Sequence, residues 1–183
     1  MNKIIATVGI CLLLATAVTD AATCRTELPS STPTDRFNTT NETVNDKQTT
    51  LIWTRCAIGQ QWTGSACAGE AQAMSWSEAV ALVQHINQQG LAGQKDWRLP
   101  MVPELASIVE RQCFNPRVNE AVFPGAPSAV FWSSMEKMGT TDLAYSLDFG
   151  GGAAKATLKD FKGAVRLVRG GPWWEPPKMM SSK

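Results

Sequence analysis

The chain has 183 residues, and 17 Lys and Arg against 16 Asp and Glu leave a formal net charge of +1. This balance argues against nucleic acid as a partner, because a protein that follows a phosphate backbone needs a basic stripe. A chain of this length is long enough for one domain with its own core. The composition therefore indicates a single globular domain whose partner is not nucleic acid.

The N-terminal segment has the pattern of a secretory signal peptide. Lys3 precedes an apolar run over residues 4–17, and small residues follow it. Three cleavage positions stay open: after Ala17, Ala21 or Ala22. The run is shorter than the ~20 apolar residues that span a bilayer, and no later segment would do so. We expect residues 1–22 to be removed and the remaining chain, without a membrane span, to reach the periplasm, the cell surface or the extracellular space.

Cysteine usage fits an oxidising compartment. Removal of the signal leaves Cys24, Cys56, Cys67 and Cys113, an even number that predicts two disulfides. The short, glycine-containing loop between Cys56 and Cys67 favours their pairing, and Cys24 then pairs with Cys113. The competing interpretation, a zinc site built from the four thiolates, lacks the CxxC pair that such sites use. We expect neither a metal nor a cofactor.

Composition divides the exported chain into three parts. Residues 23–41 are rich in Pro, Ser, Thr and Asn, with Leu28 and Phe37 as the only bulky apolar side chains, which predicts a linker. Residues 42–171 hold the periodic patterns and form the predicted domain. Residues 172–183 show no periodicity, and we expect a flexible tail.

Two helices are predicted in the first half of the domain. Ser75 and Glu78 form a capping box, apolar side chains follow at helical spacing, and Gly90 supplies the stop. Pro103 stands in the first turn of a second, shorter helix that ends near Gln112. Each helix carries one apolar stripe, which we expect to face the core.

Strand periodicity marks five further runs: residues 49–53, 130–133, 144–149, 153–158 and 165–169. Three consecutive glycines at 150–152 separate two of these runs and predict a hairpin turn. The order of helices followed by an antiparallel sheet makes the predicted fold class α+β.

Several motifs fall in the order found in a known family. They are Asp96-Trp97-Arg98-Leu99-Pro100, Phe131-Trp132-Ser133-Ser134 and Val165-Arg166-Leu167-Val168-Arg169. Together they make residues 37–171 resemble the Lcl C-terminal domain family, named after the C-terminal domain of a collagen-like bacterial adhesin. The resemblance implies a C-type-lectin-like α+β fold, secretion or surface display, and binding to sulfated polysaccharide or to cells. It implies no catalysis.

Two departures from the family pattern bear on metal binding and on the second helix. Residues 38–43 stand where many members carry an Asp- and Gly-rich loop, and Met101 stands where many have a capping Thr. A hard cation such as Ca²⁺ needs several oxygen ligands gathered together, so the first departure weakens a calcium site.

Tryptophan is the leading candidate for ligand contact, because the apolar faces of indoles stack on sugar rings. Four of the seven lie on apolar stripes and are expected in the core: Trp53, Trp76, Trp97 and Trp132. Trp62 lies in the loop between Cys56 and Cys67, where no pattern requires burial, and it is the preferred contact residue. Trp173 and Trp174 are either partner contacts or part of a flexible end.

Positive charge gathers in the last third of the chain: Lys137, Lys155, Lys159, Lys162, Arg166 and Arg169. A solvated sheet face is the simplest explanation. The functional explanation is a shallow cationic surface, on which acidic or sulfated polysaccharide makes many weak contacts that fade with salt. Lys137, Lys159 and Lys162 are the candidate ligand contacts of that surface.

The sequence offers few groups for catalysis. His85 is the only histidine and lies on the polar face of the first helix, so the usual nucleophilic and zinc sites have no candidate set. Asp96 and Arg98 are expected to pair with each other, or Arg98 with Asp148. A glycosidase built on two carboxylates stays open, since such pairs leave no sequence spacing. The available carboxylates are Glu110, Glu120, Asp142 and Asp160.

We predict a secreted or surface-displayed, lectin-like adhesion module that binds acidic or sulfated polysaccharide or a surface protein. The alternative is a structural or accessory subunit of a surface fibre such as a pilus, and an enzyme acting on envelope polymers comes third. Self-association into a homo-oligomer stays open. The prediction is thus a binding domain and not an enzyme.

Overall fold

A computed structural model describes residues 22–171 of the chain. The predicted signal peptide, apart from Ala22, and the predicted tail with Trp173 and Trp174 lie outside these residues. Within residues 22–171, no helix combines the length and the apolar character needed to cross a bilayer.

The first helix confirms its sequence signals. Helix α1 spans Trp76–Gln89. The Ser75 hydroxyl accepts the Glu78 N–H at 3.3 Å, and the Glu78 carboxylate accepts the Ser75 N–H at 2.6 Å. Gly90 follows in a left-handed conformation with φ of 84°, which glycine adopts without steric cost. Both ends of α1 are therefore fixed by local interactions.

The second helix is shorter than predicted. Helix α2 spans Val102–Ser107 and ends well before Gln112. Its N-terminus is capped by the Glu104 carboxylate, which accepts the Met101 N–H at 2.7 Å. Past the helix, the backbone N–H of Glu110 bonds to the Arg117 carbonyl. After α2 the chain therefore turns back on itself and does not continue as a helix.

Every pair of neighbouring strands is antiparallel. One sheet has the order β10-β9-β8, from Ala154–Leu158, Leu143–Asp148 and Val130–Glu136. A second has the order β11-β4-β3-β2, from Val168–Arg169, Ile52–Thr54, Thr43–Asp46 and Phe37–Thr39. Two short ribbons join β1 (Thr23–Cys24) to β7 (Cys113–Phe114) and β5 (Gln61–Trp62) to β6 (Cys67–Ala68).

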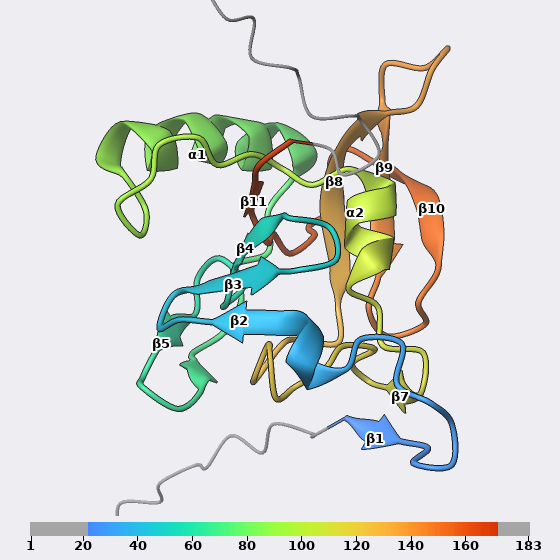
Figure 1. Cartoon of the computed structure of the whole chain (residues 1–183). Coiled ribbons are helices and arrows are strands. Elements are labelled where there is room, and N and C mark those ends of the chain that lie inside the picture. Colours follow the sequence, from blue (N-terminus) through green and yellow to red (C-terminus); the bar gives the residue numbers. More distant parts are fainter. Residues whose placement is uncertain (1–21, 172–183) are drawn as a thin grey trace, which may run out of the picture.

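These elements confirm the α+β class. Figure 1 shows α1 on one side of the molecule and the β8–β10 sheet on the other, with the hairpin between β8 and β9 projecting outward. The glycines at 150–152 join β9 to β10, as the hairpin prediction requires. The predicted strand at 165–169 is regular only at β11, although Val165 and Leu167 are fully buried.

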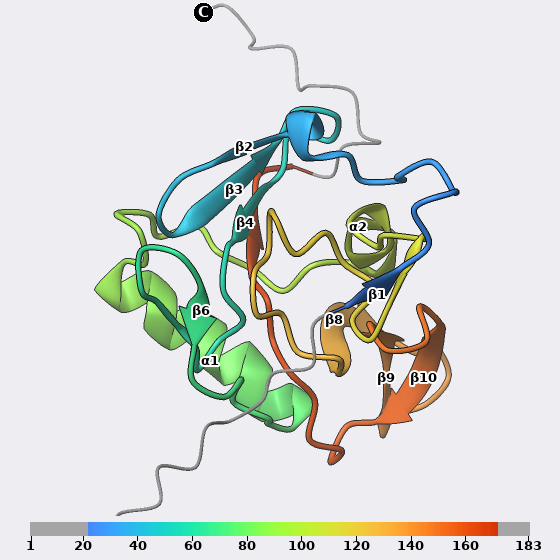
Figure 2. The same ribbon diagram turned by 90° about the horizontal axis from the view of Figure 1, so that it is seen from below.

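The segment 23–41 was expected as a linker, and this expectation is wrong. It contributes β1, a short 3-10 helix (Thr34–Arg36) and β2, and the Phe37 side chain is buried with its ring 6.0 Å from the Phe123 ring. Arg36 pairs with the fully buried carboxylate of Asp46. Figure 2 shows this segment, in blue, running along the body of the molecule. A polar segment can thus be ordered by hydrogen bonds with few apolar side chains of its own.

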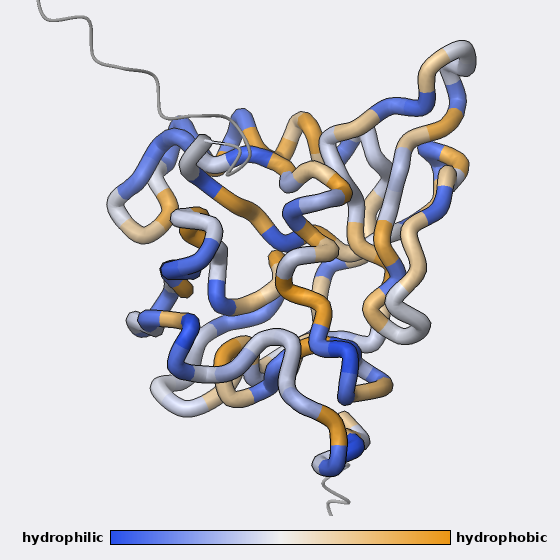
Figure 3. The backbone as a smooth tube through the Cα atoms, turned by 45° about the vertical axis from the view of Figure 1, so that its right-hand side comes forward, coloured by the Kyte–Doolittle hydropathy of each residue, from blue (hydrophilic) through white to orange (hydrophobic). Residues whose placement is uncertain are grey.

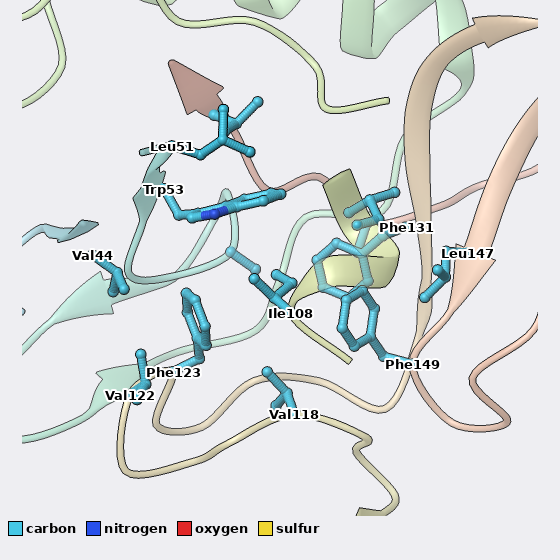
Figure 4. Close-up of a cluster of buried hydrophobic side chains, with 14 of the residues drawn as sticks. Val44, Leu51, Trp53, Ile108, Val118, Val122, Phe123, Phe131, Leu147 and Phe149 are labelled. Carbon is cyan, nitrogen blue, oxygen red and sulfur yellow. The ribbon is translucent and has the colours of Figure 1, made fainter. Parts of the chain in front are cut away.

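Most of the tryptophans expected in the core are buried there. Trp53, Trp97 and Trp132 are at most 2% exposed. Figure 4 shows Trp53 among the aliphatic and phenyl side chains of the first of two clusters. Trp76 is only partly buried against the second cluster, and its indole N–H donates to the Ser133 carbonyl at 2.9 Å. In Figure 3, apolar stretches of the backbone run through the interior while polar stretches lie outside.

Both predicted disulfides are present. Cys24 bonds to Cys113 across 89 residues, and Cys56 bonds to Cys67 across 11 residues. The first ties the N-terminal segment to β7. The second closes the loop that carries Trp62.

Candidate functional site

A hollow of about 570 Å³ lies beside the ribbon that the Cys56–Cys67 disulfide closes. We call it the Trp62 hollow. It is lined by Asn41, Glu42, Thr54, Cys56, Ala57, Ile58, Gly59, Gln60, Gln61, Trp62 and Leu91. Its walls come from three separate segments, the turn after β2, the end of β4 with the disulfide loop, and the turn after α1. The sequence prediction placed Trp62 in a loop, and the structure places it in the wall of a concave surface.

A neighbouring arginine holds the Trp62 ring. The Arg55 guanidinium carbon lies 3.8 Å from the centre of the indole, within range of a cation–π contact. Arg55 also donates to the Thr40 carbonyl at 2.8 Å, which fixes the guanidinium. Burial lowers the pKa of Arg55. The indole N–H of Trp62 and the Nε–H of Arg55 are both buried without a hydrogen-bond partner. The ring is therefore held by stacking and not by hydrogen bonding.

A larger groove of about 810 Å³ adjoins the Trp62 hollow, and both are lined by Gln60. We call it the Phe161 groove. It is lined by Gln60, Gly69, Glu70, Ala71, Ala73, Asn115, Glu120, Gly125, Ala126, Pro127, Ser128, Ala129, Val130, Phe161, Lys162 and Ala164. The Phe161 side chain is 45% exposed, which is high for a phenyl ring. The only sign of this exposure in the sequence is that Phe161 stands between two charged residues, Asp160 and Lys162.

The wall between the two hollows is rigid. The Gln60 amide donates to the Gly125 carbonyl at 2.8 Å and accepts the Ala57 N–H at 3.2 Å. Gly125 has a φ of 68°, and a Cβ there would lie 2.7 Å from the Cys67 carbonyl oxygen. Only glycine can have this positive φ and leave room for the Cys67 carbonyl without a shift of the backbone. The disulfide loop and the loop around Gly125 are consequently locked together through Gln60.

The predicted ligand contacts do not converge on one site. Lys162 lines the Phe161 groove and Trp62 lines the adjoining hollow, but Lys137 and Lys159 line neither. Lys137 follows β8, in the turn that leads to β9, and its backbone N–H bonds to the Leu143 carbonyl. Figures 1 and 2 place the β5–β6 ribbon and the β8–β9 hairpin at opposite sides of the molecule.

Two of the three lysines are neutralised by carboxylates. Lys162 pairs with Glu78 at 2.6 Å, and this hydrogen bond, together with those from Ser75, lowers the pKa of Glu78 to about 2. Lys159 pairs with Glu136, and its ammonium lies 4.6 Å from the centre of the Trp76 ring. The structure therefore reduces the positive field that the sequence suggested for this end of the chain.

Arg166 does not belong to the cationic surface at all. It is 2% exposed, donates to the Thr54 carbonyl at 2.8 Å, and lies 4.6 Å from the centre of the Phe123 ring. Burial lowers the pKa of Arg166 to about 9. Alternation in a strand predicts one exposed face and hence a surface charge at Arg166, whereas residues 163–168 are buried on both faces.

Asp96 and Arg98 each pair elsewhere. Arg98 binds Glu104 through both terminal nitrogens, at 2.7 and 2.6 Å, and Asp96 binds Arg169 at 2.7 Å. The suggested pairing of Arg98 with Asp148 is wrong, because the Asp148 carboxylate accepts the Gly150 N–H in the β9–β10 turn.

Among the carboxylates considered for a glycosidase, Glu110 has a structural role. It is buried and accepts hydrogen bonds from Ser30, Ser31, Thr32 and Gln112. Asp142 and Asp160 are exposed outside both hollows, and Glu120 lines the Phe161 groove. Among residues 22–171, no three His, Cys, Asp or Glu side chains gather as a metal site would require.

Comparison with known proteins gives one family match. The family model of the Lcl C-terminal domain matches residues 42–169, most of the chain. No curated protein sequence matches the chain. The matched residues contain the whole of the Trp62 hollow except Asn41 and the whole of the Phe161 groove.

Proposed function

Because the chain belongs to the Lcl C-terminal domain family, we propose that it is an exported adhesion domain that holds extracellular polysaccharide on the Trp62 hollow and the Phe161 groove. The family is adhesion-related and extracellular, and two disulfides suit an oxidising compartment. The proposed activity is binding without turnover.

The observation that carries this proposal is that the two hollows lie next to each other. They share Gln60, and each has an aromatic side chain in its lining, Trp62 in one and Phe161 in the other. Aromatic rings offer apolar faces on which sugar rings stack. A surface with two such platforms suits an extended polymer better than a single small molecule. Side-chain amides and carboxylates in the lining, such as those of Asn41 and Glu70, are suited to sugar hydroxyls.

An acidic or sulfated polymer is the preferred class. Lys162 is the cation of the groove, and its partner Glu78 lies on the surface. An exposed ion pair contributes only about 0–1 kcal/mol, so a sulfate or carboxylate of the ligand can replace Glu78 at little cost. The expected binding weakens as salt rises, because exposed charge pairs are screened.

Binding to dextran sulfate and to neutral dextran tests the proposal, measured by calorimetry at two salt concentrations. Trp62→Ala and Phe161→Ala should each weaken dextran sulfate binding by about tenfold, as the loss of one stacking contact predicts. Lys155→Ala is the matched control, because Lys155 is an exposed residue of β10 outside both hollows, and it should bind as the unaltered protein does. Unchanged affinity of both aromatic variants would refute the proposal.

A subunit of a surface fibre is the second candidate, and the β8–β9 hairpin favours it. Met138 is 94% exposed and Met135 is 38% exposed on this projecting hairpin (Figure 1). Exposed methionines adapt to partner surfaces of varied shape. A partner protein that binds the unaltered domain but not Met138→Lys, with dextran sulfate having no effect, would favour this function.

Turnover of an envelope polymer abolished by Glu120→Gln would instead indicate an enzyme.

A further inference from the structure

The N-terminal end of the described chain is fixed next to a carboxylate. The backbone nitrogen of Ala22 donates to a Glu120 oxygen at 2.7 Å, across 98 residues of sequence. Immediately after it, Thr23 and Cys24 pair with Phe114 and Cys113 in the β1–β7 ribbon. The Cys24–Cys113 disulfide anchors the same two strands. The position of the Ala22 nitrogen is thus set by ribbon, disulfide and carboxylate together.

We propose that export removes residues 1–21, so that Ala22 becomes the mature N-terminus and its α-ammonium pairs with Glu120. A signal peptidase would hydrolyse the Ala21–Ala22 peptide bond. The hydroxyl of the water joins the Ala21 carbonyl carbon, and the Ala22 nitrogen gains hydrogen and is an ammonium at neutral pH. This inference rests on the proposed export.

Of the three cleavage positions that the sequence leaves open, those after Ala17 and Ala21 both suit the peptidase, and the folded domain favours the one after Ala21. Cleavage after Ala21 puts Thr19 and Ala21, both small, at the two positions that a signal peptidase recognises. Cleavage after Ala22 would put the charged Asp20 there. Cleavage after Ala17 would leave the Asp20 carboxylate two residues from the group that Glu120 binds, and like charges repel.

The new charge would lie at the edge of the proposed binding surface. Glu120 lines the Phe161 groove and also a hollow of about 450 Å³ on the side of Cys24. An ammonium on Glu120 neutralises a carboxylate of the groove, which removes a repulsion toward an acidic polymer. Maturation should therefore strengthen the binding of acidic polysaccharide.

The first test is the mass and N-terminal sequence of the protein recovered after export from its own signal. We expect a chain that begins at Ala22. A mature chain that begins at Val18 or Thr23 would overturn the inference while leaving export intact. An unprocessed chain retained inside the cell would overturn the proposed export as well.

The second test compares chains that begin at Ala22 with a free or an acetylated amine. Acetylation should lower the melting temperature by about 3 °C, but should have no such effect in Glu120→Gln, because the ion pair is then already lost. Asp142→Asn, which alters an exposed carboxylate, is the control and should respond to acetylation as the unaltered chain does. An equal effect of acetylation with and without Glu120 would overturn the pairing.

Binding to dextran sulfate completes the test. Acetylation should weaken binding severalfold at low salt, and equal affinity would overturn the proposed link between maturation and binding. If neither form binds, the proposed polysaccharide function fails, while the melting temperatures still decide whether the α-ammonium pairs with Glu120.

Discussion

The Arg98 guanidinium binds the fully buried Glu104 carboxylate with both of its terminal nitrogens. Arg98 also donates to the Gly170 carbonyl at 2.9 Å, and Glu104 caps α2 through the Met101 N–H. One ion pair thereby joins the segment before α2, the helix itself and the end of β11.

Removal of one partner of this pair should destabilise the domain strongly. Glu104→Ala leaves a partly buried guanidinium unpaired and uncaps α2, so we expect the free energy of unfolding to fall by about 3 kcal/mol. Glu104→Leu combined with Arg98→Met should recover part of the loss, because two apolar side chains leave no buried charge. Urea denaturation measures both. A loss below 1 kcal/mol in Glu104→Ala would contradict this account of the pair.

Stability should depend on pH through Glu110. Burial raises the pKa of Glu110, but hydrogen bonds from Ser30, Ser31, Gln112 and Thr32 outweigh burial and lower it from 4.5 to about 2. A depressed pKa gives stability that is present above pH 4.5 and is lost as the pH falls toward 2. We expect a contribution of order 2–3 kcal/mol.

Urea denaturation of Glu110→Gln at pH 7 and pH 3 checks this contribution. The variant should be less stable than the unaltered protein at pH 7, and the difference should shrink at pH 3. Glu78→Gln is the comparison, because Glu78 also has a pKa near 2 but is exposed, so that its bonds to Lys162 and to the Ser75 N–H contribute less to stability. If both variants behave alike, Glu110 does not anchor the N-terminal segment.

The two disulfides should differ in their effects. Replacement of Cys24 and Cys113 by Ser opens a loop of 89 residues and should cost about 4–5 kcal/mol, whereas replacement of Cys56 and Cys67 opens one of 11 residues and should cost about 3 kcal/mol. The second change should also weaken dextran sulfate binding, because Cys56 lines the Trp62 hollow. Thermal denaturation and calorimetry measure the two effects. A larger loss of stability on removal of the Cys56–Cys67 disulfide would contradict the expectation that the longer loop contributes more.

Substitution of Trp53 and of Trp62 should affect stability and binding differently, because the first is a core residue and the second belongs to the candidate site. Trp53→Ala empties a fully buried position and should cost about 4 kcal/mol of stability. Trp62→Ala removes a half-buried ring held by Arg55 and should cost about 1 kcal/mol, while binding falls. Chemical denaturation compares them directly. Similar losses would mean that Trp62 is a core residue.

The features that the sequence predicts are local ones. The Ser75 and Glu78 cap lies within one turn of helix, the three glycines at 150–152 form their own hairpin, and the disulfides follow once the short loop is closed. In each case the residues that decide the structure stand within about a dozen positions of each other, or are few enough to pair by elimination.

The features that the sequence could not supply depend on distant partners. Phe37 packs against Phe123, and this contact orders the segment that was predicted to be a linker. Arg98 pairs with Glu104 and not with Asp148, because the fold brings α2 beside Arg98. The candidate site likewise depends on residues that are far apart in the sequence. The Trp62 position was predictable, but the groove is made by segments that meet only in the folded chain, and no spacing in the sequence announces Phe161 as its second aromatic platform.

The Cys24–Cys113 disulfide also has a mechanical consequence. If the domain is pulled between an N-terminal tether and a C-terminal attachment, tension enters at Cys24 and crosses directly to Cys113. The 88 intervening residues, which include α1, α2 and the Trp62 hollow, lie inside the covalent loop and cannot be drawn out end to end. Tension between the two ends of the chain would therefore not unravel the wall of the Trp62 hollow.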